Sequence, residues 1–183
     1  KNRLIFGHLN INSIRNKIEM LGDIVVGKLD IFLLSETKID DSFLTAQFYL
    51  QGFSTPYRSN RSNHGGGLLL YIRSDIPSKS VYQFIMSNNV ECIFIEINIY
   101  KKKWLVWGTY NPQKSNSTEF LNVLSKYLDQ YFKIYDNIIL LGDFNLEPKE
   151  IIMDDFCKLN NLKSIVNEPT CYKNQQNPSC IDL

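Results

Sequence analysis

The run VECIFIEINIY at residues 90–100 constrains the fold more than any other part of the sequence. Its alternation of two kinds of side chain has a period of two, which predicts a strand with two unlike faces. The run KKWLVWGTYNP at residues 102–112 predicts an antiparallel neighbour, joined to the first strand by a tight basic connection. The alternating residues are Ile93, Ile95, Ile97 and Ile99 on one face, and Cys92, Phe94, Glu96 and Asn98 on the other.

Further helices and strands are expected on both sides of this hairpin. Apolar residues spaced i, i+4, i+7 and i+11 from Ile14 predict an amphipathic helix, with Asn12 or Ser13 as its N-terminal cap. The other expected elements are a helix over 117–132, a poorer helix near 150–160, a polar loop over 54–66, and strands over 3–10, 30–38, 67–75, in the apolar run from 138, and at the final CIDL.

The order of these elements indicates the architecture. Strands occur early, in the middle and late, and helices separate only some of them. A wholly parallel sheet would need a crossover connection between every pair of strands. We therefore predict an α/β fold in which two mixed β-sheets pack face to face, with helices outside.

Composition limits the function classes. The 183 residues fit a single domain, and 44% hydrophobic residues are enough for a substantial core. A net charge of +1 gives no overall basic field, so any nucleic-acid binding must depend on local patches. The four cysteines form no C-x-x-C pair, which favours free thiols in a reducing compartment. No signal peptide and no apolar run long enough to span a membrane is present, and both ends look cut from a longer chain.

Polar residues stand at the ends of four predicted strands. Asp143 and Asn145 follow one apolar run at a spacing of two residues, and they should share a face if extended geometry persists past Gly142. Asn10 and Asn12 repeat this spacing after the first strand, Glu36 ends the second, and Tyr110 ends another. A hydrophobic core does not need these residues, so we expect them to converge on one rim and form a site.

The residue types suit phosphoryl transfer. Glu36 with the Asn10 carbonyl offers oxygen ligands to Mg²⁺, which takes one or two carboxylates and keeps several waters. Asp143 is a candidate base for the attacking water, and Asn145 and Tyr110 are candidate donors to phosphate oxygens. The sequence has no Cys/His pair or Ser/His/Asp order for acyl transfer. With only two histidines, it also has no histidine-rich metal site.

Each element alone has an alternative structural role. Asn10 and Asn12 are equally suited to capping a helix, Glu36 to a surface position, and the GDFN segment to a turn. Tyr110 is equally suited to half-buried packing with a hydrated hydroxyl. Basic residues at 58 and 61 are candidates for contacting DNA or for an ordinary solvated loop. The conjunction of these residues in this order favours the functional interpretation.

Six motifs occur in order along the chain: HLNINSIRNK, LLSETKI, GGGLLLYIR, GTYNP, LLGDFN and PSCIDL. Together they resemble the endonuclease/exonuclease/phosphatase superfamily and, more closely, the apurinic-type endonuclease domain of non-LTR retrotransposons. The resemblance covers nearly the whole chain. It implies a four-layer α/β sandwich with two β-sheets inside and an active site on the rim where strands end.

The resemblance also implies a role for individual residues. Glu36 is the metal ligand, assisted by Asn10, and Asn12 lies near the metal. The remaining implied roles are contact with the scissile phosphate for Tyr110, orientation or deprotonation of the attacking water for Asp143, phosphate binding for Asn145, support of a catalytic histidine for Asp182, and weaker DNA contacts for Arg58, Arg61 and Asn111.

A function follows from this resemblance. The chain is expected to be the Mg²⁺-dependent (or Mn²⁺-dependent) DNA endonuclease domain of a retroelement, which nicks target DNA to prime reverse transcription. Its partners would be DNA and, in the full-length element, a C-terminal reverse transcriptase domain, with action in the nucleus. Two alternatives stay open: another phosphodiesterase or phosphatase of the same fold, and a degenerate remnant without catalysis.

The chain departs from the family at its C-terminal end. Relatives end in an S-D-H segment that supplies a second aspartate and the catalytic histidine, and the sequence stops before such a segment. Neither His8 nor His64 stands at an equivalent place. We therefore expect one domain over residues 1–183 that is incomplete at its C-terminus, with its last strand or strands missing, and inactive or nearly so by itself.

Overall fold

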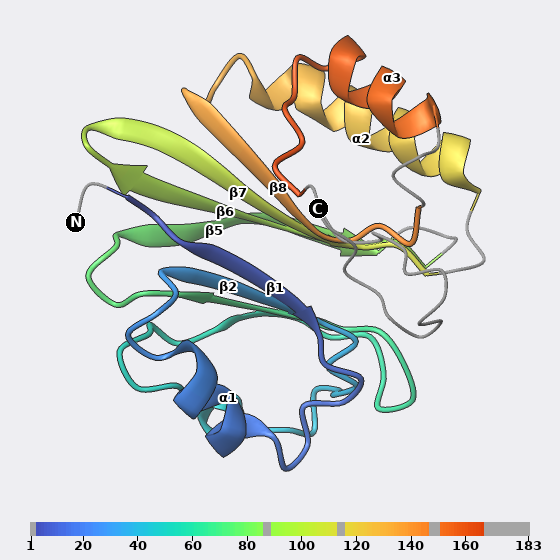
Figure 1. The fold of residues 1–183 in the computed structure, drawn as a ribbon. Helices are drawn as coiled ribbons and strands as arrows, with labels where there is room; N and C mark the ends of the chain where they lie inside the picture. Colours follow the sequence, from blue (N-terminus) through green and yellow to red (C-terminus); the bar gives the residue numbers. More distant parts are fainter. Residues whose placement is uncertain (1–2, 86–88, 113–115, 147–150, 167–183) are drawn as a thin grey trace.

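Two four-stranded β-sheets pack face to face between helices (Figure 1). The computed structural model describes residues 3–85, 89–112, 116–146 and 151–166. The strands in these ranges are β1 (Phe6–Asn10), β2 (Ile31–Ser35), β3 (Tyr57–Ser59), β4 (Leu68–Ile72), β5 (Ser78–Ile85), β6 (Glu91–Ile99), β7 (Lys102–Tyr110) and β8 (Asn137–Asp143). The helices there are α1 (Ile18–Val25), a 3-10 turn η1 (Thr45–Phe48), α2 (Ser117–Tyr131) and α3 (Ile151–Leu159).

Both sheets are mixed, as predicted. The first has the order β1-β2-β4-β3, and only its β1–β2 pair is parallel. The second has the order β5-β6-β7-β8, and only its β7–β8 pair is parallel. Each parallel pair is joined by a crossover that contains a helix, α1 in the first sheet and α2 in the second. The two sheets therefore contain one strand–helix–strand unit each.

The predicted hairpin is confirmed in detail. Strands β6 and β7 pair antiparallel along their whole length, from Glu91 opposite Tyr110 to Ile99 opposite Lys102. The two connecting residues, Tyr100 and Lys101, have φ values of 51° and 61°. Positive φ at both central residues is the geometry of a type I′ turn, whose twist matches that of the flanking strands.

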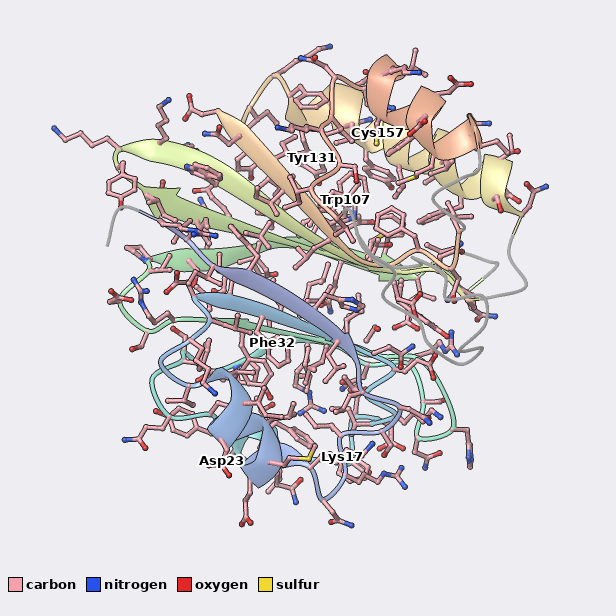
Figure 2. The ribbon with its side chains drawn as sticks, viewed as in Figure 1. Lys17, Asp23, Phe32, Trp107, Tyr131 and Cys157 are labelled. Atoms are coloured by element: carbon pink, nitrogen blue, oxygen red, sulfur yellow. The ribbon has the colours of Figure 1, made fainter. Side chains whose placement is uncertain are left out.

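The two faces of β6 pack into different layers of the core. Ile93, Ile95 and Ile97 lie between the two sheets, where they meet apolar side chains of β2 and β4. Cys92 and Phe94 lie on the opposite face, against α2. Figure 2 shows Trp107 and Tyr131 in this outer layer, and Phe32 on the face of the other sheet that packs toward α1. Three apolar layers between four structural layers confirm the predicted α/β sandwich.

The first helix begins later than predicted. Ile14 is buried, but it precedes α1, whose N-cap is Lys17 with no side-chain cap hydrogen bond. Asn12 and Ser13 have positive φ values of 44° and 78°, a left-handed conformation that the helix cannot continue from. The prediction that one of them caps the helix was wrong, because both lie in a turn four or more residues before it.

Two strands were absent from the sequence-based assignment. The predicted polar loop over 54–66 contains β3, which pairs with β4 from Tyr57 to Ser59. Residues 78–85 form β5, an edge strand whose side chains are mostly exposed and whose pairing shifts register between Ser80 and Tyr82. A strand is recognised in a sequence by its burial pattern. Strand β3 is too short to show one, and β5 lacks one because it is exposed and contains a β-bulge.

The later elements follow the prediction closely. Helix α2 buries Phe120, Leu124 and Leu128 against the second sheet, and Asn116 caps it by accepting hydrogen bonds from two backbone N–H groups. A helix occupies 151–159, where the poorer helix was expected. The expected strand at CIDL lies outside the described residues. No helix among the described residues is long and apolar enough to cross a membrane.

Candidate active site

The carboxyl ends of the two parallel strand pairs meet at one rim of the sandwich. Parallel strands end at the same edge of a sheet. The carboxyl ends of β1 and β2 therefore lie together at this rim, and so do those of β7 and β8. Strand β8 also packs against β1 and β2 of the other sheet. The predicted strand-end residues Asn10, Glu36, Tyr110 and Asp143 are thereby brought together.

A single carboxamide group links the two carboxylates of the rim. The Asn10 Nδ2 atom donates to Glu36 Oε1 and to Asp143 Oδ2, each at 2.8 Å. The Tyr110 hydroxyl donates to the same Glu36 Oε1 atom at 3.2 Å. Four side chains from four strand ends therefore form one hydrogen-bonded cluster across both sheets.

Glu36 is held by the backbone that surrounds it. It follows the last residue of β2 and has a left-handed φ of 52°, which is uncommon for a residue other than glycine. Its carbonyl accepts from Ser13 N at 2.8 Å, and the next two amides donate to the carbonyls of Gly67 and Gly66 at 3.2 and 2.9 Å. These bonds fix the direction in which the carboxylate leaves the chain.

Asp143 is positioned by strand pairing instead. It is the last residue of β8, in register with Tyr110, and only 1% of it is exposed. Its carbonyl accepts from Asn111 N at 2.8 Å, which continues the pairing beyond the strand. The preceding Gly142 has φ 149°, and a Cβ there would lie 1.9 Å from Thr109 O. Only glycine permits this approach of β8 to β7.

The environment keeps Tyr110 a hydrogen-bond donor. Burial, with the nearby carboxylates of Glu36 and Asp143, raises the pKa of its hydroxyl above the ordinary value. The phenol is therefore neutral at physiological pH. Lys38 is a cation near Glu36: its ammonium group donates to Asn12 Oδ1 and lies 3.8 Å from Glu36 Oε2.

The donor set suits a hard divalent cation. Glu36 and Asp143 offer carboxylate oxygens, and the amide oxygen of Asn10, which accepts from Asn12 N at 3.2 Å, lies beside them. Mg²⁺ characteristically takes one or two carboxylates and retains water. No group of three or more His, Cys, Asp or Glu side chains with metal-binding geometry occurs among the described residues. The two carboxylates of the rim match the number that Mg²⁺ takes, and water would complete its coordination.

Asn145 and Asn12 lie in turns, not in the extended geometry on which their expected positions depended. Asn145 has φ 48°, so extended geometry ends at Asp143. Its backbone N–H donates to Asp143 Oδ1 at 3.1 Å, and its Nδ2 atom donates to Asn111 O at 2.6 Å. Asn12 contacts Asn10 through its backbone N–H and Lys38 through its side chain. Both residues border the cluster, and neither hydrogen-bonds to Glu36.

The three residues predicted to contact DNA make intramolecular contacts. Arg58 donates to Phe43 O and Thr45 Oγ1, each at 2.8 Å, and to the carbonyl of Asp40. Arg61 donates to Gly65 O in its own loop and to Asn89 O before β6. Asn111 is 2% exposed, and its Nδ2 atom donates to Phe144 O. Their contact with DNA stays a prediction. Asp182 lies outside the described residues.

Sequence reasoning missed a buried carboxylate beside the cluster. Glu91 is 0% exposed and lies opposite Tyr110 in the β6–β7 pairing. A signal for it was present in the alternating run, because Glu91 falls on the same face as Ile93, Ile95 and Ile97, which is the face buried between the sheets. An acidic residue on a core face needs a partner, and that requirement points to a specific role.

Comparison with known proteins relates this geometry to a family. The sequence pattern described as the Endonuclease/Exonuclease/phosphatase family matches residues 7–183. Among curated protein sequences, none matches the chain significantly.

Solved structures with the same fold include enzymes of several activities. A 3′ phosphatase from Neisseria, bound to a product DNA hairpin, aligns with a TM-score of 0.70 at 14% identity, over 98% of this chain and 85% of that chain. The endonuclease domain of TRAS1, a telomere-specific non-LTR retrotransposon, aligns with a TM-score of 0.69 at 14% identity, over 96% and 80%. A mannosyl-6-phosphatase from Bacteroides thetaiotaomicron aligns with a TM-score of 0.65 at 14% identity, over 86% and 71%. At such identities the similarity concerns the fold alone.

Proposed function

The chain belongs to the endonuclease/exonuclease/phosphatase family, and from that premise we propose that it is a metal-dependent DNA endonuclease domain of a non-LTR retroelement. One observation carries the proposal: the Glu36 and Asp143 carboxylates converge on the amide of Asn10 where four strands end. Two carboxylates held this close to one amide are suited to bind a divalent cation, and a bound cation favours a phosphate ester as substrate.

The residues of the rim divide the work of phosphodiester hydrolysis. Glu36 and Asn10 would hold Mg²⁺ or Mn²⁺, with Asn12 beside them, and the ion when bound supplies Lewis-acid stabilisation of charge on the phosphate. Asp143 accepts a proton from the attacking water, for which its buried carboxylate is directed into the cluster. Tyr110 and Asn145 donate hydrogen bonds to phosphate oxygens as negative charge develops.

DNA is the proposed substrate, and reverse transcriptase the proposed partner. The sequence motifs resemble retrotransposon endonucleases, and two of the aligned structures are named for a retrotransposon endonuclease domain and for an enzyme bound to a DNA hairpin. In a complete element the nick would leave a 3′-hydroxyl that primes reverse transcription.

A second candidate function is hydrolysis of a small phosphomonoester. The alignment with a mannosyl-6-phosphatase favours it, since the same rim geometry serves either class of phosphate ester. Substrate choice then depends on the loops around the rim, where relatives of one fold diverge.

The test is a substrate panel with plasmid DNA, RNA and mannose 6-phosphate, each with Mg²⁺, Mn²⁺ or EDTA. Residues 1–183 are assayed beside a version extended by the S-D-H segment of relatives, because that segment is proposed to supply the catalytic histidine. We expect metal-dependent nicking of plasmid DNA by the extended version. Phosphate release from mannose 6-phosphate without nicking would refute the endonuclease proposal in favour of the second candidate.

A further inference from the structure

Glu91 is a buried carboxylate that the proposed chemistry does not use. Its side chain is fully excluded from solvent at the start of β6. Its Oε2 atom accepts from Gly67 N at 2.7 Å, and its Oε1 atom lies 3.2 Å from Arg61 Nη1 as an ion pair without hydrogen-bond alignment. A buried carboxylate costs free energy that a single ion pair seldom recovers, so stability alone does not account for its presence.

Arg61 connects this carboxylate to the rim. Its guanidinium carbon lies 6.0 Å from the centroid of the Tyr110 ring. Its Nε atom donates to Gly65 O at 3.1 Å, and its Nη1 atom donates to Asn89 O at 3.3 Å. The guanidinium is therefore held by two loop carbonyls and by Glu91, and the tyrosine ring lies beside it. A cation held over a ring in this way restricts where the ring lies.

The glycines before β4 make the arrangement possible. A Cβ on Gly66 would lie 2.1 Å from Glu91 Oε1 and 2.5 Å from Arg61 Nε. Gly66 also has φ 70°, which favours glycine independently of space. The backbone therefore approaches the ion pair more closely than any other residue type would allow.

We propose that Glu91 is a positioning residue of the rim site, which acts through Arg61 to hold the Tyr110 ring so that its hydroxyl meets Glu36. The expected effect on kcat rests on the proposed function, whereas the expected effect on the position of the Tyr110 ring rests on geometry alone. Arg61 accordingly serves the tyrosine rather than the DNA backbone.

Energetics agree with a positioning role. Burial raises the pKa of the Glu91 carboxyl to about 7, against the opposing effects of the Gly67 N–H group and Arg61. A group retained in spite of this cost is expected to contribute through what it orients. Displacing a reactive group by about 1 Å can lower a rate by on the order of 10²-fold, which is the scale of effect to be expected here.

The kinetic experiment compares two glutamates of the same strand. Glu91→Gln in the nicking-competent version is expected to lower kcat by about 10- to 100-fold with KM for plasmid DNA unchanged. The matched control is Glu96→Gln, because Glu96 is also a largely buried glutamate of β6 with a cationic partner, Lys79 at 3.2 Å, but it packs on the opposite face. The control is expected to keep kcat.

A double-mutant cycle then identifies the route. If Glu91 acts through the tyrosine hydroxyl, Glu91→Gln has no further effect on kcat once Tyr110→Phe has removed that hydroxyl. Independent, multiplied losses in the double variant would overturn the proposal. A raised KM in Arg61→Lys would also overturn it, because it would indicate contact with DNA instead.

A spectroscopic experiment works without any nicking. In NMR spectra of residues 1–183 with ¹³C-labelled tyrosine, Tyr110→Phe assigns the Tyr110 ring signals. Glu91→Gln is expected to shift these signals, Arg61→Lys to shift them as well, and Glu96→Gln to leave them in place. Unchanged Tyr110 signals in folded Glu91→Gln or Arg61→Lys would refute the positioning role. If these shifts occur while the extended version fails to nick DNA, the proposed function alone is refuted.

Discussion

The two strand–helix–strand units, β1–α1–β2 and β7–α2–β8, share one connectivity but present their carboxylates differently. Asp143 is part of β8 and stands in register with Tyr110, so sheet pairing positions it. Glu36 lies one residue beyond β2 with a left-handed φ of 52°, so loop hydrogen bonds position it. The same rim therefore depends on rigid strand geometry on one side and on assembled loops on the other.

This difference indicates which substitutions should disrupt the β7–β8 side of the rim and which the β1–β2 side. The β7–β8 side requires close approach of two backbones at Gly142. The β1–β2 side requires the glycine loop before β4 and the side chains that hold it, among them Glu91. Substitutions in the two halves should consequently differ in whether they affect stability, activity or both.

The largest expected effect tests whether both halves are needed for chemistry. Glu36→Gln and Asp143→Asn keep the shape of each side chain but remove its charge. Each is expected to lower nicking by the extended version by about 10²–10³-fold, comparable to the loss of one preorganised group that stabilises the transition state. Rates are measured on plasmid DNA with Mg²⁺, and circular dichroism checks that the fold is retained. Full nicking by either variant would remove that residue from the catalytic set.

The next effect compares one glycine of each half. Gly142→Ala places a Cβ 1.9 Å from the backbone oxygen of Thr109, which cannot move without separating β8 from β7. Gly67→Ala places a Cβ 2.4 Å from the Thr37 hydroxyl, which can rotate. We expect losses in the free energy of unfolding of about 3 kcal/mol for Gly142→Ala and about 1–2 kcal/mol for Gly67→Ala. Urea unfolding measures both, and equal losses would contradict the contrast between backbone and side-chain contact.

The pH dependence of stability sharpens the comparison at Glu91. Its pKa is raised from 4.5 to about 7 in the folded state, so the folded protein binds the proton more tightly than the unfolded one. Stability from this group is present below pH 4.5 and is lost as pH rises toward 7, by up to about 3 kcal/mol. Arg61 faces the group, and Glu36 acts on it from the rim.

The measurement is urea unfolding of wild type and Glu91→Gln between pH 4.5 and 7.5. The free energy of unfolding of the variant, relative to wild type, should rise across this interval because glutamine does not titrate. A constant difference between the two proteins would show that Glu91 keeps an ordinary pKa.

The smallest effect concerns the two crossover helices. Helix α2 has a side-chain cap, in which Asn116 Oδ1 accepts from the N–H groups of Thr118 and Glu119, whereas α1 has none. Asn116→Ala should lower the free energy of unfolding by about 1 kcal/mol, and Asn116→Asp should preserve it, since a carboxylate also accepts these bonds. Thermal unfolding compares the two. An equal loss in both variants would show that the cap does not depend on the oxygen acceptor.

The sequence predicted the helices and strands whose buried residues recur with a regular period. Strands β6 and β7, helix α2 and the end of β8 were predicted because each buries a face with a regular period. Strand β5 was missed because it is an exposed edge with a bulge, and β3 because three residues carry no measurable period. For these two strands the pairing partner, rather than the local sequence, decides the structure.

The site was predictable where strands end and unpredictable where turns begin. Asn10, Glu36, Tyr110, Asp143 and Asn145 were expected to converge. The side chains of the first four form one hydrogen-bonded cluster, and Asn145 borders it. The directions of Asn12 and Asn145 were not predictable, because positive φ values of 44° and 48° interrupt the alternation of strand side chains. Glu91 was overlooked because its importance depends on Arg61 and Gly67, which are distant in sequence. The catalytic roles stay predictions until activity is measured.

The bond between Asn10 and Asp143 also sets the time at which the site comes into being, since it joins residues 133 positions apart. At synthesis rates of about 5–20 residues per second, Asp143 follows Asn10 by roughly 7 to 27 seconds. Closing so long a segment is entropically costly, and both sheets must be in place before the carboxylates meet. A nascent chain that has not yet released Asp143 from the ribosome thus has no assembled rim, and the cluster forms only after both sheets have folded.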